Sequence, residues 1–204
     1  MTVVSVEKGA DPEVLNVGLE DGSRFLFRLS YLEAPYASGE ELLGRALSME
    51  EETDLRFAGE RYRAERAALR LIALREHSRA ELSVKLRKRG FGEREIAPVL
   101  ARLIDERLLD DARFAELWVE SRLARKCEGP AVLLARLRAH GVSREIAREA
   151  VNRAVGGDRE ASLVERFLAA EGGAGSGDDR LVRLRLRKAG FSSGAIREAL
   201  ERKS

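Results

Sequence analysis

The sequence predicts a mainly α-helical chain, in which three tandem three-helix repeats follow a small N-terminal antiparallel β element. One apolar and basic phrase occurs three times, at Leu86–Phe91, Leu137–Val142 and Leu186–Phe191. Its glycines lie 51 and 49 residues apart, a period typical of stacked supersecondary units. Charged residues make up 35% of the chain and aromatic residues only 5%, which favours helices. We therefore expect an elongated, curved array that presents a long surface to other macromolecules.

The β element is expected in the first thirty residues, which are rich in Val, Leu and Phe with partial alternation. The predicted strands are Thr2–Glu7, Val14–Glu20 and Arg24–Leu29, and Asp21–Gly22 is a strong hairpin signal between the last two. A short helix is expected at Glu40–Ala46. We assign residues 1–60 to an N-terminal extension, which carries 5 basic and 13 acidic side chains.

The first repeat is assigned to residues 61–109. A capping box at Ser48–Glu51 opens a helix that is expected to run through Glu60 into Arg75, and a second box at Ser78–Glu81 opens the next helix. Gly90 is placed to end that helix in a left-handed conformation. A third helix is expected from Glu93 to Glu106.

The second and third repeats are assigned to residues 110–157 and 158–204. In the second, Asp110 or Asp111 is expected as an N-cap, Pro130 suits the first position of the middle helix, and Ser143 caps the last helix. In the third, which opens at Asp158, the segment 180–187 alternates apolar residues with arginines as a strand would, but its register with the other repeats favours a helix. Residues 172–177 are a glycine-rich stretch expected to be flexible.

Patterns of catalytic or metal-binding residues are missing from the sequence. His77 and His140 lie far apart without neighbouring ligands, and the lone Cys127 cannot form an internal disulfide. The pair Asp110–Asp111 could hold a divalent cation, but a helix N-cap explains it better. We expect a non-enzymatic, cytoplasmic protein without cofactor, metal, signal peptide or membrane span.

The basic residues form the candidate contact surface. Residues 61–204 carry 32 basic and 22 acidic side chains, so this part has a net charge of +10. Three basic clusters occupy equivalent places in the repeats, and one more ends the first helix of the second repeat. Such a stripe is typical of contact with phosphates or with an acidic protein groove, although charged helices can also simply be soluble. The candidate residues are Lys85, Arg87, Lys88, Arg89, Arg122, Arg125, Lys126, Arg136, Arg138, Arg183, Arg185, Arg187 and Lys188.

The aromatic residues are expected in the core and not in a surface for base stacking. Phe114 and Trp118, for example, fall at apolar positions of the first helix in the second repeat. Any contact with nucleic acid would then be made mainly to the backbone and would be sensitive to salt.

Three phrases together resemble the RecX family of bacterial recombination regulators. They are Arg75–Leu82 with its Arg-x-x-Ser-x-x-Glu-Leu pattern, Leu86–Phe91, and Asp110–Ala115 with its Asp-Asp-x-Arg-Phe-Ala pattern. The resemblance covers roughly residues 64–204. Two departures stand out: Val142 replaces the phenylalanine of the other repeats, and the glycine run is expected to loosen the third repeat.

The resemblance implies a fold of three tandem three-helix repeats and a regulator of recombination and DNA repair. It implies binding to the RecA recombinase, in the groove of its filament on DNA, with restraint of ATP hydrolysis and strand exchange. A rival interpretation is a direct DNA-binding protein that uses its repeats on the phosphate backbone, and a third is a scaffold for unrelated proteins. A monomer is expected, and the role of the acidic extension does not follow from the resemblance.

Overall fold

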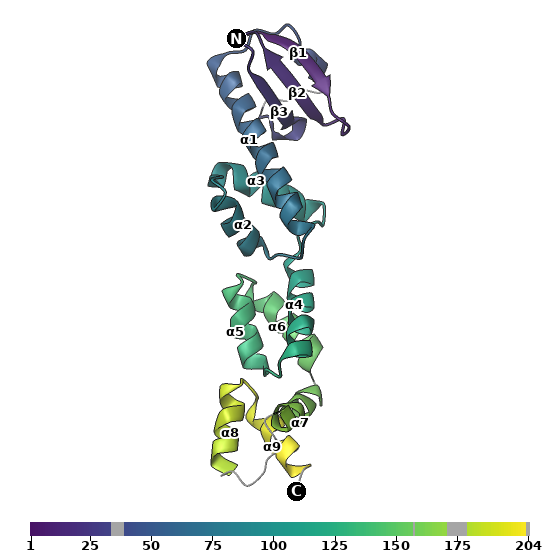
Figure 1. Ribbon diagram of the computed structural model, residues 1–204, viewed down its shortest axis with the longest axis vertical. Helices are drawn as coiled ribbons and strands as arrows, with labels where there is room; N and C mark the ends of the chain where they lie inside the picture. Colours follow the sequence, from purple (N-terminus) through teal and green to yellow (C-terminus); the bar gives the residue numbers. More distant parts are fainter. Residues whose placement is uncertain (34–38, 157, 171–178, 203–204) are drawn as a thin grey trace. The chain divides into compact units, whose positions relative to one another are not determined.

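A computed structural model describes residues 1–33, 39–156, 158–170 and 179–202 (Figure 1). The chain forms two compact units. Unit 1 contains residues 1–76 and 82–109, and unit 2 contains residues 77–81 and 110–204. Among the described residues, no helix is long and apolar enough to cross a membrane.

The N-terminal sheet of unit 1 has three antiparallel strands in the order β1-β2-β3. The sequence predicted an antiparallel sheet of two or three strands here, without the strand order. The strands are β1 (Val3–Lys8), β2 (Val14–Leu19) and β3 (Arg24–Arg28). The predicted hairpin joins β2 to β3, and Gly22 adopts the positive φ of +86° that this turn requires. Leu15, Val17 and Phe27 are fully buried on one face of β2 and β3, and Phe25 is partly buried beside them, so the sheet packs on the helices through this face.

The short helix expected at Glu40–Ala46 is confirmed only over its first residues, and as a 3-10 helix. The chain makes one 3-10 turn, η2 (Gly39–Leu42), and then leaves the helical conformation at Gly44, whose φ is +76°. Ala46 instead forms an isolated antiparallel bridge with Thr2 beside the first strand. A second 3-10 turn, η1 (Leu29–Tyr31), follows β3. Pairing with the sheet therefore overrides the local preference of this charged segment for a helix.

Three helices complete unit 1: α1 (Met49–Ile72), α2 (Arg79–Arg87), whose first turn belongs to unit 2, and α3 (Glu93–Asp105). The capping box that was predicted at Ser48 is present, with both of its hydrogen bonds. α1 ends three residues before the expected Arg75, and it crosses the position between residues 60 and 61 without a break. One continuous apolar core reaches from the sheet to α3.

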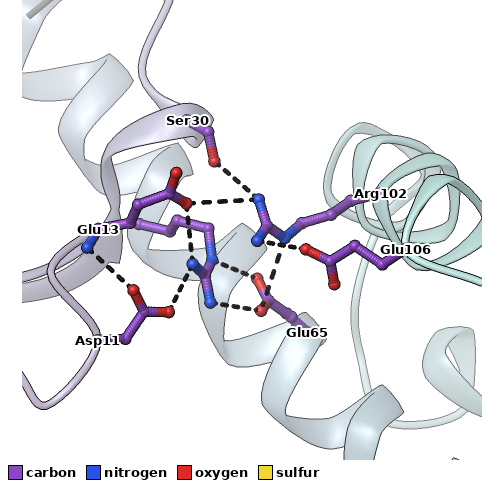
Figure 2. Close-up of polar contacts among 7 residues, drawn as sticks. Asp11, Glu13, Ser30, Glu65, Arg102 and Glu106 are labelled. Atoms are coloured by element: carbon purple, nitrogen blue, oxygen red, sulfur yellow. Dashed lines mark hydrogen bonds and ion pairs between the residues drawn. The ribbon is translucent and has the colours of Figure 1, made fainter. Parts of the chain in front are cut away.

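A network of charges, buried at Arg28 and Glu65, fastens the sheet to the helices of unit 1 (Figure 2). Arg28 of β3 is only 8% exposed, and its guanidinium bonds Glu65 of α1 through Nη2 at 3.1 Å and Nε at 3.3 Å. Its Nη1 contacts Asp11 at 2.7 Å and Glu13 at 3.0 Å in the turn between β1 and β2. Arg102 of α3 joins the same carboxylates from the other side. Three elements distant in sequence are thus tied by one cluster.

The network also changes the proton affinities of its members. Burial opposes the charge of Arg28, but hydrogen bonds to Glu65, Glu13 and Asp11 outweigh this cost and raise its pKa. A hydrogen bond from the backbone amide of Glu13, followed by that from Arg28, lowers the pKa of Asp11. The charged form of each group is therefore favoured in the folded state.

Unit 2 contains the second and third sets of three helices. These are α4 (Asp111–Arg125), α5 (Pro130–Ala139), α6 (Arg144–Val155), α7 (Arg159–Ala170), α8 (Asp179–Lys188) and α9 (Ser193–Glu201). Asp110 is the N-cap of α4, Pro130 occupies the first turn of α5, and Ser143 caps α6, as predicted. The ambiguous segment 180–187 is helical. The expected glycine-rich loop at 172–177 lies outside the described residues.

One apolar core also runs through unit 2 and includes residues from all six of its helices. Phe114 is 3% exposed, as expected for a core residue. Trp118 is only half-buried and packs against the imidazole of His140 with ring centroids 5.3 Å apart. Phe167 of α7 and Phe191, which follows α8, meet edge to face at 5.8 Å. These ring contacts lie within single repeats, whereas the shared apolar core includes residues of both repeats and holds the third repeat to the second.

A main-chain joint holds the start of α5 against the end of α8. The amide of Gly129 donates to the carbonyl of Ala189 at 2.8 Å, and the amide of Ala131 donates to that of Gly190 at 3.1 Å. A Cβ placed on Gly129 would lie only 2.2 Å from the carbonyl carbon of Gly190, so no larger residue fits there without movement. The donors lie at the N-terminus of α5 and the acceptors follow the C-terminus of α8. Each helix end therefore supplies the hydrogen-bond partners that the other end lacks.

A related contact involves residues 77–81 of unit 2. The hydroxyl of Ser78 donates to the carbonyl of His140 at 2.6 Å, and the Cβ of Ala80 fills the space beside Gly141. The carboxylate of Glu81 meets Nδ1 of His77 at 3.1 Å and Nδ1 of His140 at 2.7 Å. The glycine after α5 is therefore covered in the same way as the glycine after α8.

Candidate functional site

The predicted basic residues lie in both units. Lys85 and Arg87 are on α2 and Lys88 and Arg89 follow it in unit 1, where Arg87 pairs with the exposed Glu93 at 3.0 Å. All the other predicted residues are in unit 2, on or directly after α4, α5 and α8. The basic residues of the two units are therefore two separate candidate sites.

Four of the predicted residues of unit 2 surround one hollow of about 500 Å³, which we call the junction hollow. Arg125 and Lys126 come from the end of α4, Arg136 from α5 and Lys188 from the end of α8. Its lining also includes four apolar residues, Val132, Phe167, Ala170 and Ala189, together with Cys127 and Glu128. The lining therefore combines these apolar side chains, which we call the floor of the hollow, with basic side chains.

Glu128 organises one wall of the junction hollow. Its carboxylate accepts two hydrogen bonds from Arg122, at 2.8 Å from Nε and 2.7 Å from Nη2, and a third from Arg136 at 3.2 Å. The hydrogen bond from Arg122 lowers the pKa of Glu128, and the charges of Arg122, Arg136 and Lys126 act in the same direction. The paired geometry fixes the guanidinium of Arg122, because a bidentate pair is planar and directional.

The remaining cations of the junction hollow stay available for a partner. Within the described part of the chain, Lys126 and Lys188 form no ion pair, and Arg125 hydrogen-bonds only Ser121. An apolar floor with cations around it can hold a segment that carries both a carboxylate and an apolar side chain. The arrangement therefore fits an acidic protein surface better than it fits a bare phosphate.

The predicted carboxylate pair, Asp110 and Asp111, accepts hydrogen bonds from backbone amides. No group of three or more His, Cys, Asp or Glu side chains there could hold a metal ion. Asp110 accepts hydrogen bonds from the amides of Ala112 and Arg113, which is the N-cap role favoured by the sequence. Asp111 accepts from the backbone amide of Arg79 at 2.7 Å.

Comparison with known proteins identifies the family. Two family models match the chain: "RecX, first three-helix domain" over residues 64–103 and "RecX, second three-helix domain" over residues 110–151. A regulatory protein RecX of Halorhodospira halophila is 39% identical over 140 residues, which are 65% of this chain and 83% of that protein. This chain belongs to the RecX family. A second relative, the regulatory protein RecX of Chromohalobacter salexigens, is 49% identical over 41% of this chain and 55% of its own length.

Solved structures of RecX-family proteins share the fold. A crystal structure of a regulatory protein RecX aligns with a TM-score of 0.75 at 18% identity, over 98% of each chain. RecX from Lactobacillus salivarius aligns with a TM-score of 0.60 at 25% identity, over 70% of this chain and 96% of that one. The tandem three-helix organisation is therefore shared with the RecX family.

Sequence reasoning missed two parts of the site in this RecX-family chain. Glu128 carries no local pattern that distinguishes it from the other acidic residues, and Phe167 was expected in the core with the other aromatic residues. Both could have been found by noting that they share a wall with α5 and α8 once the repeats are stacked. The other five predicted residues of unit 2 do not line the junction hollow, and these are Arg122, Arg138, Arg183, Arg185 and Arg187.

Proposed function

We propose that this chain regulates recombination by binding the RecA recombinase filament on DNA and restraining its ATPase and strand exchange. The observation that carries the proposal is membership of the RecX family, with 39% identity over most of the Halorhodospira halophila protein. The chain acts in this proposal as a cytoplasmic monomer and not as an enzyme.

The junction hollow supports a protein partner as the target of unit 2. Its basic side chains would meet acidic groups of a recombinase subunit, and its apolar floor would bury one of that subunit's apolar side chains. Repeated subunits along a filament would let several weak contacts of one chain act together, which raises the overall affinity without any single strong contact.

The direct test measures RecA ATPase and strand-exchange rates on DNA while this chain is added in increasing amounts. The double variant Lys126→Gln/Lys188→Gln should raise the concentration for half-inhibition about tenfold, because two charge-assisted contacts are lost. The control variant Arg148→Gln/Arg197→Gln removes the same charge from two exposed positions outside the hollow and should inhibit like the wild type.

Two results would contradict these statements separately. If the wild-type chain leaves both rates unchanged, regulation of the recombinase is wrong. If the chain inhibits but the Lys126→Gln/Lys188→Gln variant does so equally well, the junction hollow is not the contact. Binding to naked duplex as tight as to the filament would favour the rival function, direct DNA binding.

A further inference from the structure

The end of α2 differs from the equivalent ends of α5 and α8. Each of these helices is followed by a glycine with positive φ, at +90° for Gly90, +80° for Gly141 and +91° for Gly190. A Cβ on Gly141 would meet Ala80, and one on Gly190 would meet Val132, because another helix start covers each turn. Around Gly90, in contrast, nothing in the described chain lies within 4 Å of such an atom. The glycine turn of the first repeat is therefore open.

A second hollow, of about 660 Å³, lies beside this open turn. Three arginines of α1 line it, Arg63, Arg66 and Arg70, together with Arg89 at the end of α2. The rest of the lining is Ala67 and the half-buried Phe91. We call this the arginine hollow. Only Arg89 among its four cations was part of the sequence-predicted surface.

The arginine hollow concentrates positive charge that the molecule leaves largely uncompensated. No carboxylate is among its lining residues, although the chain has 35 acidic side chains against 37 basic ones. Arg66 and Arg89 form no side-chain hydrogen bond or ion pair with any part of the chain that the structure describes. Arg63 pairs with Glu60 at 2.7 Å outside the lining, and Arg70 Nε donates to the carbonyl of Arg66.

The arginines of α1 form a row on one side of the helix. Positions 63, 66 and 70 are three and four residues apart, so they share one face of α1. They span about 10 Å along the helix axis at 1.5 Å per residue. A DNA strand carries a charged phosphate at every nucleotide, so a row of this length can contact more than one phosphate. Guanidinium groups suit this task because they bind phosphate oxygens bidentately.

We propose that the arginine hollow of unit 1 binds the phosphodiester backbone of a DNA strand. This site is separate from the junction hollow, and it requires no contact with the recombinase. The open turn at Gly90 leaves room for the strand, and Phe91 supplies an apolar base below the phosphates. A purely solubilising role would not explain why four guanidinium groups surround one acid-free hollow.

The test measures binding of the full chain to fluorescein-labelled oligothymidine by anisotropy, over a series of salt concentrations and without recombinase. The variant Arg66→Gln/Arg89→Gln removes the two cations that have no intramolecular partner, so folding should be unaffected. Its affinity should fall about tenfold, and the slope of log affinity against log salt should become shallower by about 1.4, because two counterion-releasing contacts are lost. The variant Arg66→Lys/Arg89→Lys should recover the slope, since it keeps both charges.

The control variant Arg148→Gln/Arg197→Gln should bind oligothymidine with the affinity and slope of the wild type. The proposal is overturned if Arg66→Gln/Arg89→Gln also keeps the wild-type slope, or if the control variant loses as much affinity.

A competition experiment distinguishes phosphates of DNA from carboxylates of a protein as the anion that the hollow binds. If polyglutamate displaces the labelled strand as well as unlabelled oligothymidine does, the hollow recognises carboxylates of a protein and the assignment to DNA is wrong. Thermal unfolding of each variant shows that the comparison is made between folded proteins.

Discussion

The two units hold their parts together by different chemistry. Unit 1 fastens a sheet to helices through buried charges, centred on the pair of Arg28 and Glu65. Unit 2 fastens one three-helix set to the next through peptide groups, at Gly129 and Gly190, above a shared apolar core. A contact made by charged side chains depends on which residues are present. A contact made by peptide groups depends on residues that are small enough to let the two main chains approach. The two units should therefore respond to opposite kinds of substitution.

The two hollows differ in a parallel way. The junction hollow has an apolar floor and one carboxylate that two arginines neutralise, whereas the lining of the arginine hollow contains four cations and no acid. The first combination suits a protein segment and the second suits phosphates. A chain with both could touch a protein filament and the DNA within it through different surfaces.

The largest effect is expected from Glu65→Ala in unit 1. Glu65 is 3% exposed, and its removal leaves the buried guanidinium of Arg28 with only Asp11 and Glu13. The free energy of unfolding should fall by about 3 kcal/mol, because a buried charge loses its best partner. Denaturant unfolding of the full chain measures it.

The control for this substitution is Glu60→Ala, which removes an exposed pair with Arg63 on the same helix and should cost less than about 0.5 kcal/mol. Equal losses from both variants would mean that burial of the network contributes nothing. The double variant Arg28→Met/Glu65→Leu sharpens the comparison, because an apolar pair of similar volume should restore much of the lost stability.

A smaller effect is expected from Gly129→Ala in unit 2. The added methyl would overlap main-chain atoms of Gly190 and Phe191, which cannot rotate away as a side chain can. A loss of about 1–3 kcal/mol is expected from this overpacking, with faster hydrogen exchange in α8 and α9. Gly194→Ala is the matched control, since its Cβ meets nothing closer than 4.0 Å. A Gly129→Ala protein as stable as the wild type would show that the joint is loose.

The smallest effect concerns pH and Glu128. Its pKa is lower in the folded chain than its usual 4.5, so the stability it contributes is present above that value and is lost as pH falls through the folded pKa. The wild type should exceed Glu128→Gln by up to about 1 kcal/mol at neutral pH. Thermal unfolding from pH 7 downward should show the difference vanishing in acid. A difference that is constant over this range would contradict the ion pair.

The sequence predicted those parts of the fold that depend on local signals. The capping box at Ser48, the N-cap at Asp110 and the proline at the start of α5 each satisfy backbone groups within a few residues, so a short window suffices. The period of the glycine phrases identified the repeats, because each copy ends a helix in the same way. Register with the other copies also decided correctly that the segment 180–187 is helical.

The features that the sequence did not predict depend on contacts between residues far apart in the chain. Arg28, Glu65 and Arg102 carry no local mark that separates them from the other charges, which form 35% of the residues. Trp118 occupies an apolar helical position, yet it is only half-buried against His140, which no pattern indicated. The basic residues were assigned to one stripe, but the structure gathers only some of them around a hollow. The register of the repeats shows which positions are equivalent. It does not show which surface of the folded chain each position faces.

The joint at Gly129 has a consequence for how such chains lengthen. Its donors and acceptors are peptide groups, which every residue except proline supplies in full, so most neighbouring side chains are free to diverge without opening it. A tandem duplication of one repeat in the gene would copy the connector together with the module. The number of modules can therefore change in a single genetic event, without a matched set of compensating mutations.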